Sequence, residues 1–339
     1  MTTFVALDVS LEKTAICIMS ADGSIAAEVT AASDPEAIAA ELARQEAVGA
    51  DALVGLEAGP LSEWIARGLA NFGASVTLME TRQVRAALSS MVVKTDRNDA
   101  RGMAHLLRMG WFRPVHLKSM DACEQRALLA ARETLARRLK DVENSVRGLL
   151  RGFGLKLGAV GRARWGERVR EVVAGHATLA AIFEPLVAAR AALLEQLGVL
   201  DGRLLATVRD DPACRLLMTA PGVGAVVALT FRAAVDDPSR FASSKAIGPC
   251  FGLTPRRYQS GETDRSLGIS KAGDASVRRA LFTAAHVIMN QVKRSFALKT
   301  WASALAARAG MGRAKVALAR RLGVVLHRMW VDGTEFRFA

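Results

Sequence analysis

Phe4-Val5-Ala6-Leu7-Asp8 is a run of four apolar residues that ends in a carboxylate. Its length and composition predict a buried strand with Asp8 at the carboxyl end. A second run, Ala52-Leu53-Val54-Gly55-Leu56-Glu57, has the same design and places Glu57 at the end of another buried strand. The sequence therefore predicts two carboxylates at the ends of strands in one sheet.

A second pair of carboxylates follows in Lys94-Thr95-Asp96-Arg97-Asn98-Asp99-Ala100, at the predicted start of a helix. Asp96 and Asp99 are three residues apart, so they share one helix face. Two strand-end and two helix carboxylates can hold two Mg²⁺ ions about 3.5–4 Å apart, the arrangement that supports phosphate transfer. Taken singly, each acid is more consistent with a structural role, Asp96 as a helix cap and Glu57 as a strand-end acid facing solvent, although the position of Glu57 directly after its apolar run favours a side chain that points into a site.

The order of the predicted elements defines the N-terminal fold. Strands are expected at 4–9, 14–20, 25–30, 52–57 and 75–80, with helices at 34–47 and 61–72. The first three strands follow one another closely and predict an antiparallel meander, and the later connections are βαβ crossovers. This order matches the ribonuclease-H-like (RuvC-like) α/β fold with a mixed five-stranded sheet, which we assign to residues 1–118.

The middle of the chain is predicted to be helical. Residues 119–151 and 176–208 have apolar residues at three- and four-residue spacing, which indicates two long helices around a Gly-rich connector, 152–166. We interpret 119–210 as a coiled-coil region for self-association. An ordinary helical spacer is the alternative.

Residues 211–339 are expected to form a third, mostly α domain. Pro221-Gly222-Val223-Gly224 resembles the turn of a helix-hairpin-helix, in which backbone N–H groups approach a DNA phosphate. Further on, a hydroxyl followed by glycine, Ser260-Gly261, is surrounded by Arg and Lys and can attack or bind a phosphate. The expected nucleic-acid contacts are Lys13, Gly222, Gly224, Arg256, Arg257, Lys271, Arg278 and Arg279.

Charge is distributed unevenly along the chain. Residues 1–100 carry 7 Lys and Arg against 14 Asp and Glu, residues 101–250 carry 23 against 14, and residues 251–339 carry 16 against 5. The first part is therefore acidic and the rest basic, within a net charge of +13. A basic body of this kind indicates a polyanionic partner, with nucleic acid as the first candidate.

The four cysteines are scattered without a Cys-x-x-Cys pair, so we expect no structural zinc site and a reducing cytoplasm. The longest uncharged stretch, 216–231, has 16 residues and contains Pro221. It is too short to span a bilayer, so no membrane association is expected.

In combination, these motifs resemble one family. The four carboxylates, the Lys94–Ala100 segment, the Pro221–Gly224 turn, and Gly252-Leu253-Thr254-Pro255 leading to Ser260-Gly261 and Ser270-Lys271-Ala272-Gly273 occur in the order found in bacterial transposases of the insertion-sequence-110 family. These are RuvC-like recombinases with a DEDD carboxylate set and a serine. The resemblance covers nearly the whole chain. One position departs from it: members often carry Ala-Thr-Gly after the glutamate, where this chain has Ala58-Gly59-Pro60.

The resemblance implies a mechanism and partners. Asp8, Glu57, Asp96 and Asp99 would bind Mg²⁺, with Mn²⁺ as a substitute, and Ser260 would attack DNA phosphate to form a covalent phosphoserine link. The two domains would form one composite site, shared between subunits of a dimer or tetramer. A structured bridge RNA would select donor and target DNA. Such a protein would be cytoplasmic and associated with the nucleoid.

The residues alone leave other functions open. In a Holliday-junction-type nuclease water would attack and Ser260 would only contact phosphate, and Tyr258, the only tyrosine, is a competing nucleophile. A nucleic-acid-binding scaffold with an inactive first domain is a third interpretation. Actin-like ATPases share the strand meander, but their phosphate loop needs Gly two residues after the Asp, where this chain has Ser10, so that function is disfavoured.

Overall fold

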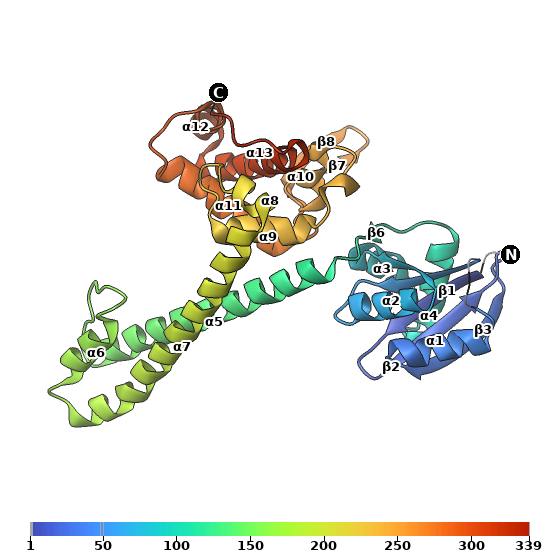
Figure 1. Cartoon of the computed structure of the whole chain (residues 1–339), viewed down its shortest axis with the longest axis horizontal. Helices are drawn as coiled ribbons and strands as arrows, with labels where there is room; N and C mark the ends of the chain where they lie inside the picture. The colour runs from blue at the N-terminus through green and yellow to red at the C-terminus, as the bar shows by residue number, and fades with distance from the viewer. Residues whose placement is uncertain (1–2, 48, 50, 339) are drawn as a thin grey trace. The chain divides into compact units, whose positions relative to one another are not determined.

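A computed structural model describes residues 3–47, 49 and 51–338 of the chain (Figure 1). The chain divides into two compact units, Met1–Lys118 and Ser119–Ala339. We call them the N-terminal and C-terminal units and describe each by itself.

The N-terminal unit is built on a six-stranded sheet in the order β3-β2-β1-β4-β5-β6. The strands are β1 Thr3–Val9, β2 Lys13–Met19, β3 Ile25–Ala32, β4 Ala52–Glu57, β5 Ser75–Met79 and β6 Pro114–Val115. β1, β2 and β3 pair antiparallel, and β1, β4 and β5 pair parallel, so the predicted mixed sheet is confirmed. The expected number of five strands is wrong, because β6 adds antiparallel to β5. β6 has only two residues, which is too short for the two-residue period of a strand to be visible in the sequence.

Helices cover both faces of this sheet. They are α1 Pro35–Arg44, α2 Ser62–Asn71, α3 Thr81–Leu88 and α4 Asp96–Arg108. Val5 and Leu7 of β1 pack with α1 and α2, whereas Phe4 and Ala6 pack with α3 and α4. This follows from the two-residue period of a strand, which sends neighbouring side chains to opposite faces. The even-numbered positions of β1 therefore face α4.

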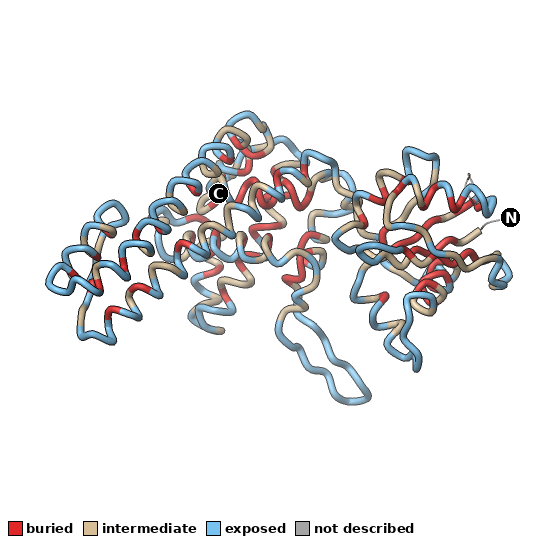
Figure 2. Tube along the Cα trace, turned by 90° about the horizontal axis from the view of Figure 1, so that it is seen from below, coloured by how far each residue is buried: buried red, intermediate tan, exposed pale blue. Residues whose placement is uncertain are grey.

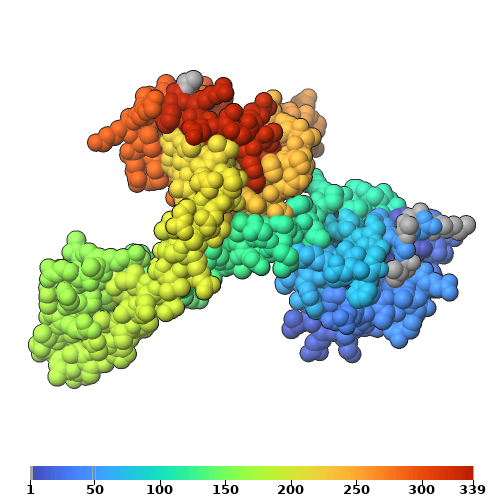
Figure 3. Space-filling model, viewed as in Figure 1, coloured from blue at the N-terminus to red at the C-terminus, as the bar shows by residue number. Residues whose placement is uncertain are grey.

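The C-terminal unit begins with two long helices, α5 Met120–Gly152 and α7 Ala177–Asp210, joined through a short helix, α6 Trp165–Val173. The long helices agree within two residues with the predicted ranges, whereas α6 falls partly in the expected connector. α5 and α7 lie side by side (Figure 3). Their outer end has its own core, which includes Trp165 and Phe183.

α7 is the one helix in the described part of the chain that is long and apolar enough to cross a membrane, by length and composition only. Only 22% of its most apolar window is buried inside the protein. Arg190, in the middle of the helix, donates through Nε to Glu143 of α5 at 2.9 Å and lies over the Trp165 ring at 4.7 Å. A buried ion pair therefore ties α7 to α5 at its centre.

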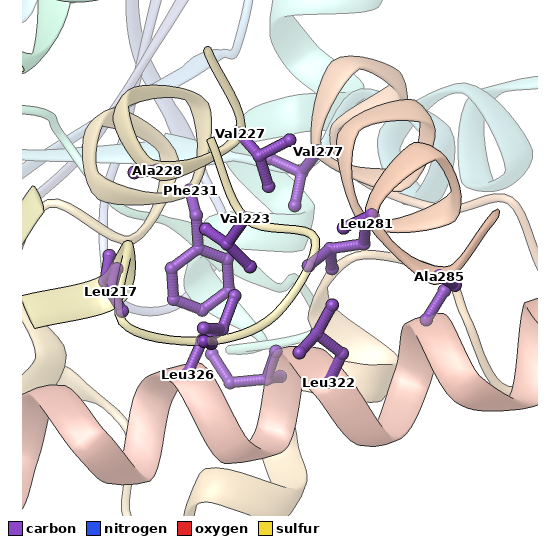
Figure 4. Packing of buried hydrophobic residues seen from close by; sticks show 14 of the residues in the cluster. Leu217, Val223, Val227, Ala228, Phe231, Val277, Leu281, Ala285, Leu322 and Leu326 are labelled. Atoms are coloured by element: carbon purple, nitrogen blue, oxygen red, sulfur yellow. The ribbon is translucent and has the colours of Figure 1, made fainter. Parts of the chain in front are cut away.

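Shorter helices pack around one hydrophobic core in the remainder of this unit. They are α8 Pro212–Leu217, α9 Ala225–Val235, α10 Ile247–Cys250, α11 Ala275–Asn290, α12 Ala297–Ala309 and α13 Met311–Asp332, with 3-10 turns at Pro238–Arg240 and Ser244–Ala246. Phe231 of α9 belongs to this core, together with Leu281 of α11 and Leu322 of α13 (Figure 4). The predicted mostly helical C-terminal region is confirmed.

We expect Arg190→Met to destabilise the C-terminal unit by about 3 kcal/mol, because it leaves the Glu143 carboxylate, which is only 20% exposed, without its partner. The double variant Arg190→Met, Glu143→Leu is expected to recover part of this loss. Chemical denaturation followed by circular dichroism measures both. Arg170→Met is the matched control, since Arg170 pairs with an exposed carboxylate, Glu184, and the midpoint should not move. An equal loss in both single variants would contradict the prediction.

Candidate active site

Strand register brings Asp8 and Glu57 together. β1 and β4 are parallel, with Leu7 opposite Leu56, so the next residue on each strand is a carboxylate. Asp8 continues the even-numbered positions that face α4, and Glu57 shares a face with Gly55, two residues earlier. Both side chains are half-buried at the carboxyl ends of neighbouring strands.

The start of α4 supplies the other two carboxylates. The Thr95 side chain caps the helix by accepting a hydrogen bond from the Asn98 N–H at 3.2 Å, and Asp96 is the first helical residue. α4 approaches the sheet closely at Gly55, where an added Cβ would lie 3.0 Å from Leu107. This close packing holds the last turn of α4 against β4, and the first turn lies near enough to Asp8 for the charges of Asp96 and Asp99 to act on it.

The four carboxylates influence one another electrostatically. Burial is the main reason that the pKa of Asp8 is raised to about 6, and the charges of Asp96, Asp99 and Glu57 contribute in the same direction. Lys94 opposes them. Burial also raises the pKa of Glu57. Such shifts mark half-buried carboxylates whose charge the protein does not fully compensate.

The donor set suits a hard divalent cation, since it consists of carboxylate oxygens that repel one another. The side chains are not closed around an ion, however. Across residues 3–47, 49 and 51–338, no three His, Cys, Asp or Glu side chains are grouped tightly enough to hold a metal. The chemistry of the residues fits Mg²⁺ or Mn²⁺, and bringing the oxygens to ligand distance requires side-chain movement.

Ser260 lies on a second feature, an exposed hairpin of β7 Pro255–Ser260 and β8 Thr263–Ile269. In Figure 2 it is the long loop drawn almost entirely in pale blue. Ser260 pairs with Thr263 next to the turn at Gly261. Tyr258 is 55% exposed on the same strand. The segment is extended, and both candidate nucleophiles are open to solvent.

Comparisons with known proteins identify the chain. A transposase family of the DEDD type matches residues 5–154, and the family described as transposase IS116/IS110/IS902 matches residues 214–300. The transposase for insertion sequence element IS1111A of Coxiella burnetii is 30% identical over 285 residues, which cover 82% of this chain and 77% of the relative. The transposase for insertion sequence element IS1328 of Yersinia enterocolitica is 27% identical over 84% and 85% of the two chains.

The chain belongs to the IS110/IS116/IS902 family of transposases. It is therefore a DNA-modifying enzyme, and DNA is its substrate. The two family matches fall on the two features described above. The first includes all four carboxylates and the second includes Ser260.

The root of the transposase hairpin is held rigidly where two segments cross. Gly252 and Gly273 both have positive φ angles, +64° and +63°, and their missing side chains leave room for backbone of the opposite segment. An added Cβ at Gly273 would lie 2.1 Å from the Cys250 carbonyl oxygen. Arg278 braces the same loop by donating to the carbonyl oxygens of Phe251, Ala272 and Gly273.

The other predicted nucleic-acid contacts have different surroundings. Arg257 makes a two-bond ion pair with Asp264, at 2.9 and 2.6 Å, and Arg279 pairs with Glu133 at 2.8 Å. Arg256 is exposed on the hairpin, and Lys271 is exposed at its root.

The two glycines predicted to contact nucleic acid have different surroundings. Gly222 packs so closely on α11 that an added Cβ would lie 2.6 Å from the Ala284 carbonyl, which is a structural reason for this glycine. Gly224 caps α9 through its backbone and has open space around it.

Sequence reasoning missed three residues beside the carboxylates. Arg97 lies next to Asp96 at the start of α4, and its guanidinium, together with that of Arg101, binds Glu28 of β3. The two hydrogen-bonded guanidinium groups lower the pKa of Glu28 to about 2. Only the fold brings Glu28 to α4, because 69 residues separate it from Arg97. In the sequence, the available signal for Arg97 is its position as a basic residue between Asp96 and Asp99.

We expect Gly273→Ala to destabilise the transposase by more than about 2 kcal/mol, because alanine disfavours positive φ and its Cβ would overlap the Cys250 carbonyl. Gly268→Ala, on β8 of the same hairpin, meets no atom within 4 Å and is the matched control. Thermal unfolding compares the two. A control that unfolds as early as Gly273→Ala would show that the hairpin, and not its root, limits stability.

Proposed function

We propose that this transposase cleaves and rejoins DNA with a divalent-ion-dependent mechanism in which the Ser260 hydroxyl is the nucleophile. The metal-binding part of this proposal is supported by the register of β1 and β4, in which Asp8 and Glu57 lie side by side next to the first turn of α4. Bound Mg²⁺ would supply Lewis-acid stabilisation of the phosphate oxygens. Asp8, Glu57, Asp96 and Asp99 would hold it.

The serine step is a substitution at phosphorus. The Ser260 oxygen forms a bond to the phosphorus of a DNA phosphodiester, the bond to one DNA oxygen breaks, and that oxygen leaves as a hydroxyl carrying the proton. A hydroxyl from another DNA end then attacks the phosphoserine and restores both the serine and a phosphodiester. The exposed position of Ser260, whose hydroxyl makes no hydrogen bond with the described residues, supports its availability to a substrate. Arg256, four residues earlier on the same strand, supplies positive charge for a phosphate.

The further partners are proposed from family likeness and from exposed surfaces. A structured bridge RNA would choose donor and target DNA, so that the DNA sequence is read by base pairing and the basic protein holds the nucleic-acid backbones.

The Pro221–Gly224 turn would act as a helix-hairpin-helix phosphate contact. It lines an open pocket together with Arg294. The α5–α7 pair would associate with a second copy, as a coiled coil, because most of the apolar window of α7 is uncovered. These roles place the protein with the nucleoid in the cytoplasm.

For the carboxylate set, we expect Asp8→Asn to lower Mg²⁺-dependent DNA cleavage at least about 100-fold, because a ligand and its negative charge are removed. The folded protein should still bind DNA. Glu12→Gln is the control, since Glu12 is an exposed acid only four residues away. Cleavage that survives in Asp8→Asn would remove the carboxylates from the mechanism.

For the serine, we expect Ser260→Ala to abolish both strand exchange and the covalent protein–DNA adduct, which is detected by denaturing electrophoresis of labelled DNA. Ser266→Ala on the facing strand is the control, because it changes a hydroxyl on the same hairpin. An adduct that persists in Ser260→Ala and disappears in Tyr258→Phe would assign the nucleophile to Tyr258. Cleavage that persists without any adduct would favour the alternative function, a structure-specific nuclease in which water attacks.

A further inference from the structure

A surface cavity of about 590 Å³ lies beside the carboxylate set, lined by Lys13, Ala15, Thr30, Thr95, Asp96 and Arg97. We infer that this groove binds the phosphodiester backbone of the DNA strand next to the phosphate that is cut. Lys13 and Arg97 would contact phosphate, and Glu28 would position Arg97. The inference rests on the proposed function, because it takes the carboxylates as the place of cleavage.

Strand register connects the groove to the carboxylates. Asp8 of β1 lies opposite Ala15 of β2, and Ala15 lies opposite Thr30 of β3, so the three residues form one row across the sheet. Neighbouring strands are about 4.8 Å apart, so the row extends about 10 Å from Asp8. The small side chain of Ala15 keeps the floor of the groove low between the two ends.

Two cations border the groove, and each is available to a ligand. Lys13 is exposed at the start of β2, and no carboxylate within the described residues forms an ion pair with its ammonium group. Arg97 uses Nε and Nη2 to bind Glu28, which leaves the Nη1 edge of the guanidinium for another acceptor. The group of Arg97, Glu28 and Arg101 carries a net charge of +1.

Glu28 holds Arg97 in place beside the groove. Its side chain is only 9% exposed, and it accepts hydrogen bonds from both guanidinium groups. Because an arginine side chain loses considerable rotamer freedom when it binds a ligand, a partner that fixes it beforehand lowers that cost. Glu28 is therefore a positioning residue and makes no contact with the substrate.

The chemistry of the lining fits a phosphate backbone. Lys, Arg and hydroxyl side chains are the usual contacts of phosphate oxygens, and Thr30 and Thr95 add hydroxyls. Amide side chains, which read adenine edges, are absent among the lining residues. Asp96 repels an anion at its own end, so the phosphate is expected between Lys13 and Arg97.

The test measures binding of the full chain to a fluorescent single-stranded DNA 20-mer in EDTA across a series of salt concentrations. We expect Lys13→Gln and Arg97→Gln each to weaken binding about 3- to 10-fold. Each should also reduce the slope of log affinity against log salt by about 0.7, the value for one phosphate contact on a single strand. Arg44→Gln is the matched control, because Arg44 is an exposed arginine on α1, on the other face of the sheet. Unchanged slopes for both groove variants would overturn the inference.

DNA binding by two Glu28 variants tests the positioning role of this residue. Glu28→Gln removes a negative charge and would tighten DNA binding if only net charge mattered, whereas loss of positioning weakens it. Glu28→Asp keeps the charge but shortens the side chain, and it should weaken binding in the same direction. Thermal unfolding confirms that both variants are folded. Tighter binding by Glu28→Gln would overturn the positioning role.

An RNA 20-mer of the same sequence is the second arm of the experiment. A defect confined to RNA would overturn the assignment of the groove to the DNA strand. Because binding is measured in EDTA, the result does not depend on a bound metal ion or on cleavage by Ser260. If Asp8→Asn retains cleavage while Lys13→Gln weakens DNA binding, the proposed mechanism is wrong and the groove assignment stands. If Asp8→Asn loses cleavage while Lys13→Gln binds DNA normally, the groove assignment is wrong and the mechanism stands.

Discussion

Parallel pairing of β1 with β4 is the constraint on which the carboxylate set depends. In register, the pair places Asp8 beside Glu57 on the face that α4 covers. A slip of one residue would turn one of the two carboxylates toward α1 and α2, where Leu7 and Leu56 now fill an apolar core. The cost of exposing those apolar side chains and burying a carboxylate without a partner maintains the register. The hydrophobic core thus positions the charged groups.

The C-terminal unit combines a well-packed body with an exposed hairpin. An isolated two-stranded hairpin is marginally stable in water, and β7 and β8 bury almost none of their residues. The tight crossing at Gly252 and Gly273 therefore anchors the hairpin. Ser260 lies at the far end, next to the turn, where substrate has access and where ordering on a nucleic-acid partner is possible without disturbing the core.

Charge in this protein is shared between structure and function. Arg257, Arg278 and Arg279 are engaged with carboxylates or carbonyl oxygens of their own unit, although the sequence presents them as free cations. Lys13, by contrast, borders a groove without an ion-pair partner among the described residues. Net charge alone predicts a polyanionic partner but does not show which cations are free to meet it.

The sequence by itself determined the strand and helix order, the mixed sheet, the long helices and the four acids, because those features depend on local periodicity and on residues adjacent in the chain. The short elements α3, β6 and α6 were not predicted. β6 has only two residues, and α6 begins inside the Gly-rich connector, so both leave weak patterns. Only the tertiary structure decided that Glu28 meets Arg97, that Arg278 is bound to backbone carbonyls, and that the carboxylates stand near one another without closing around an ion. Each of these depends on distances between segments far apart in sequence, which strand register and helix packing determine together.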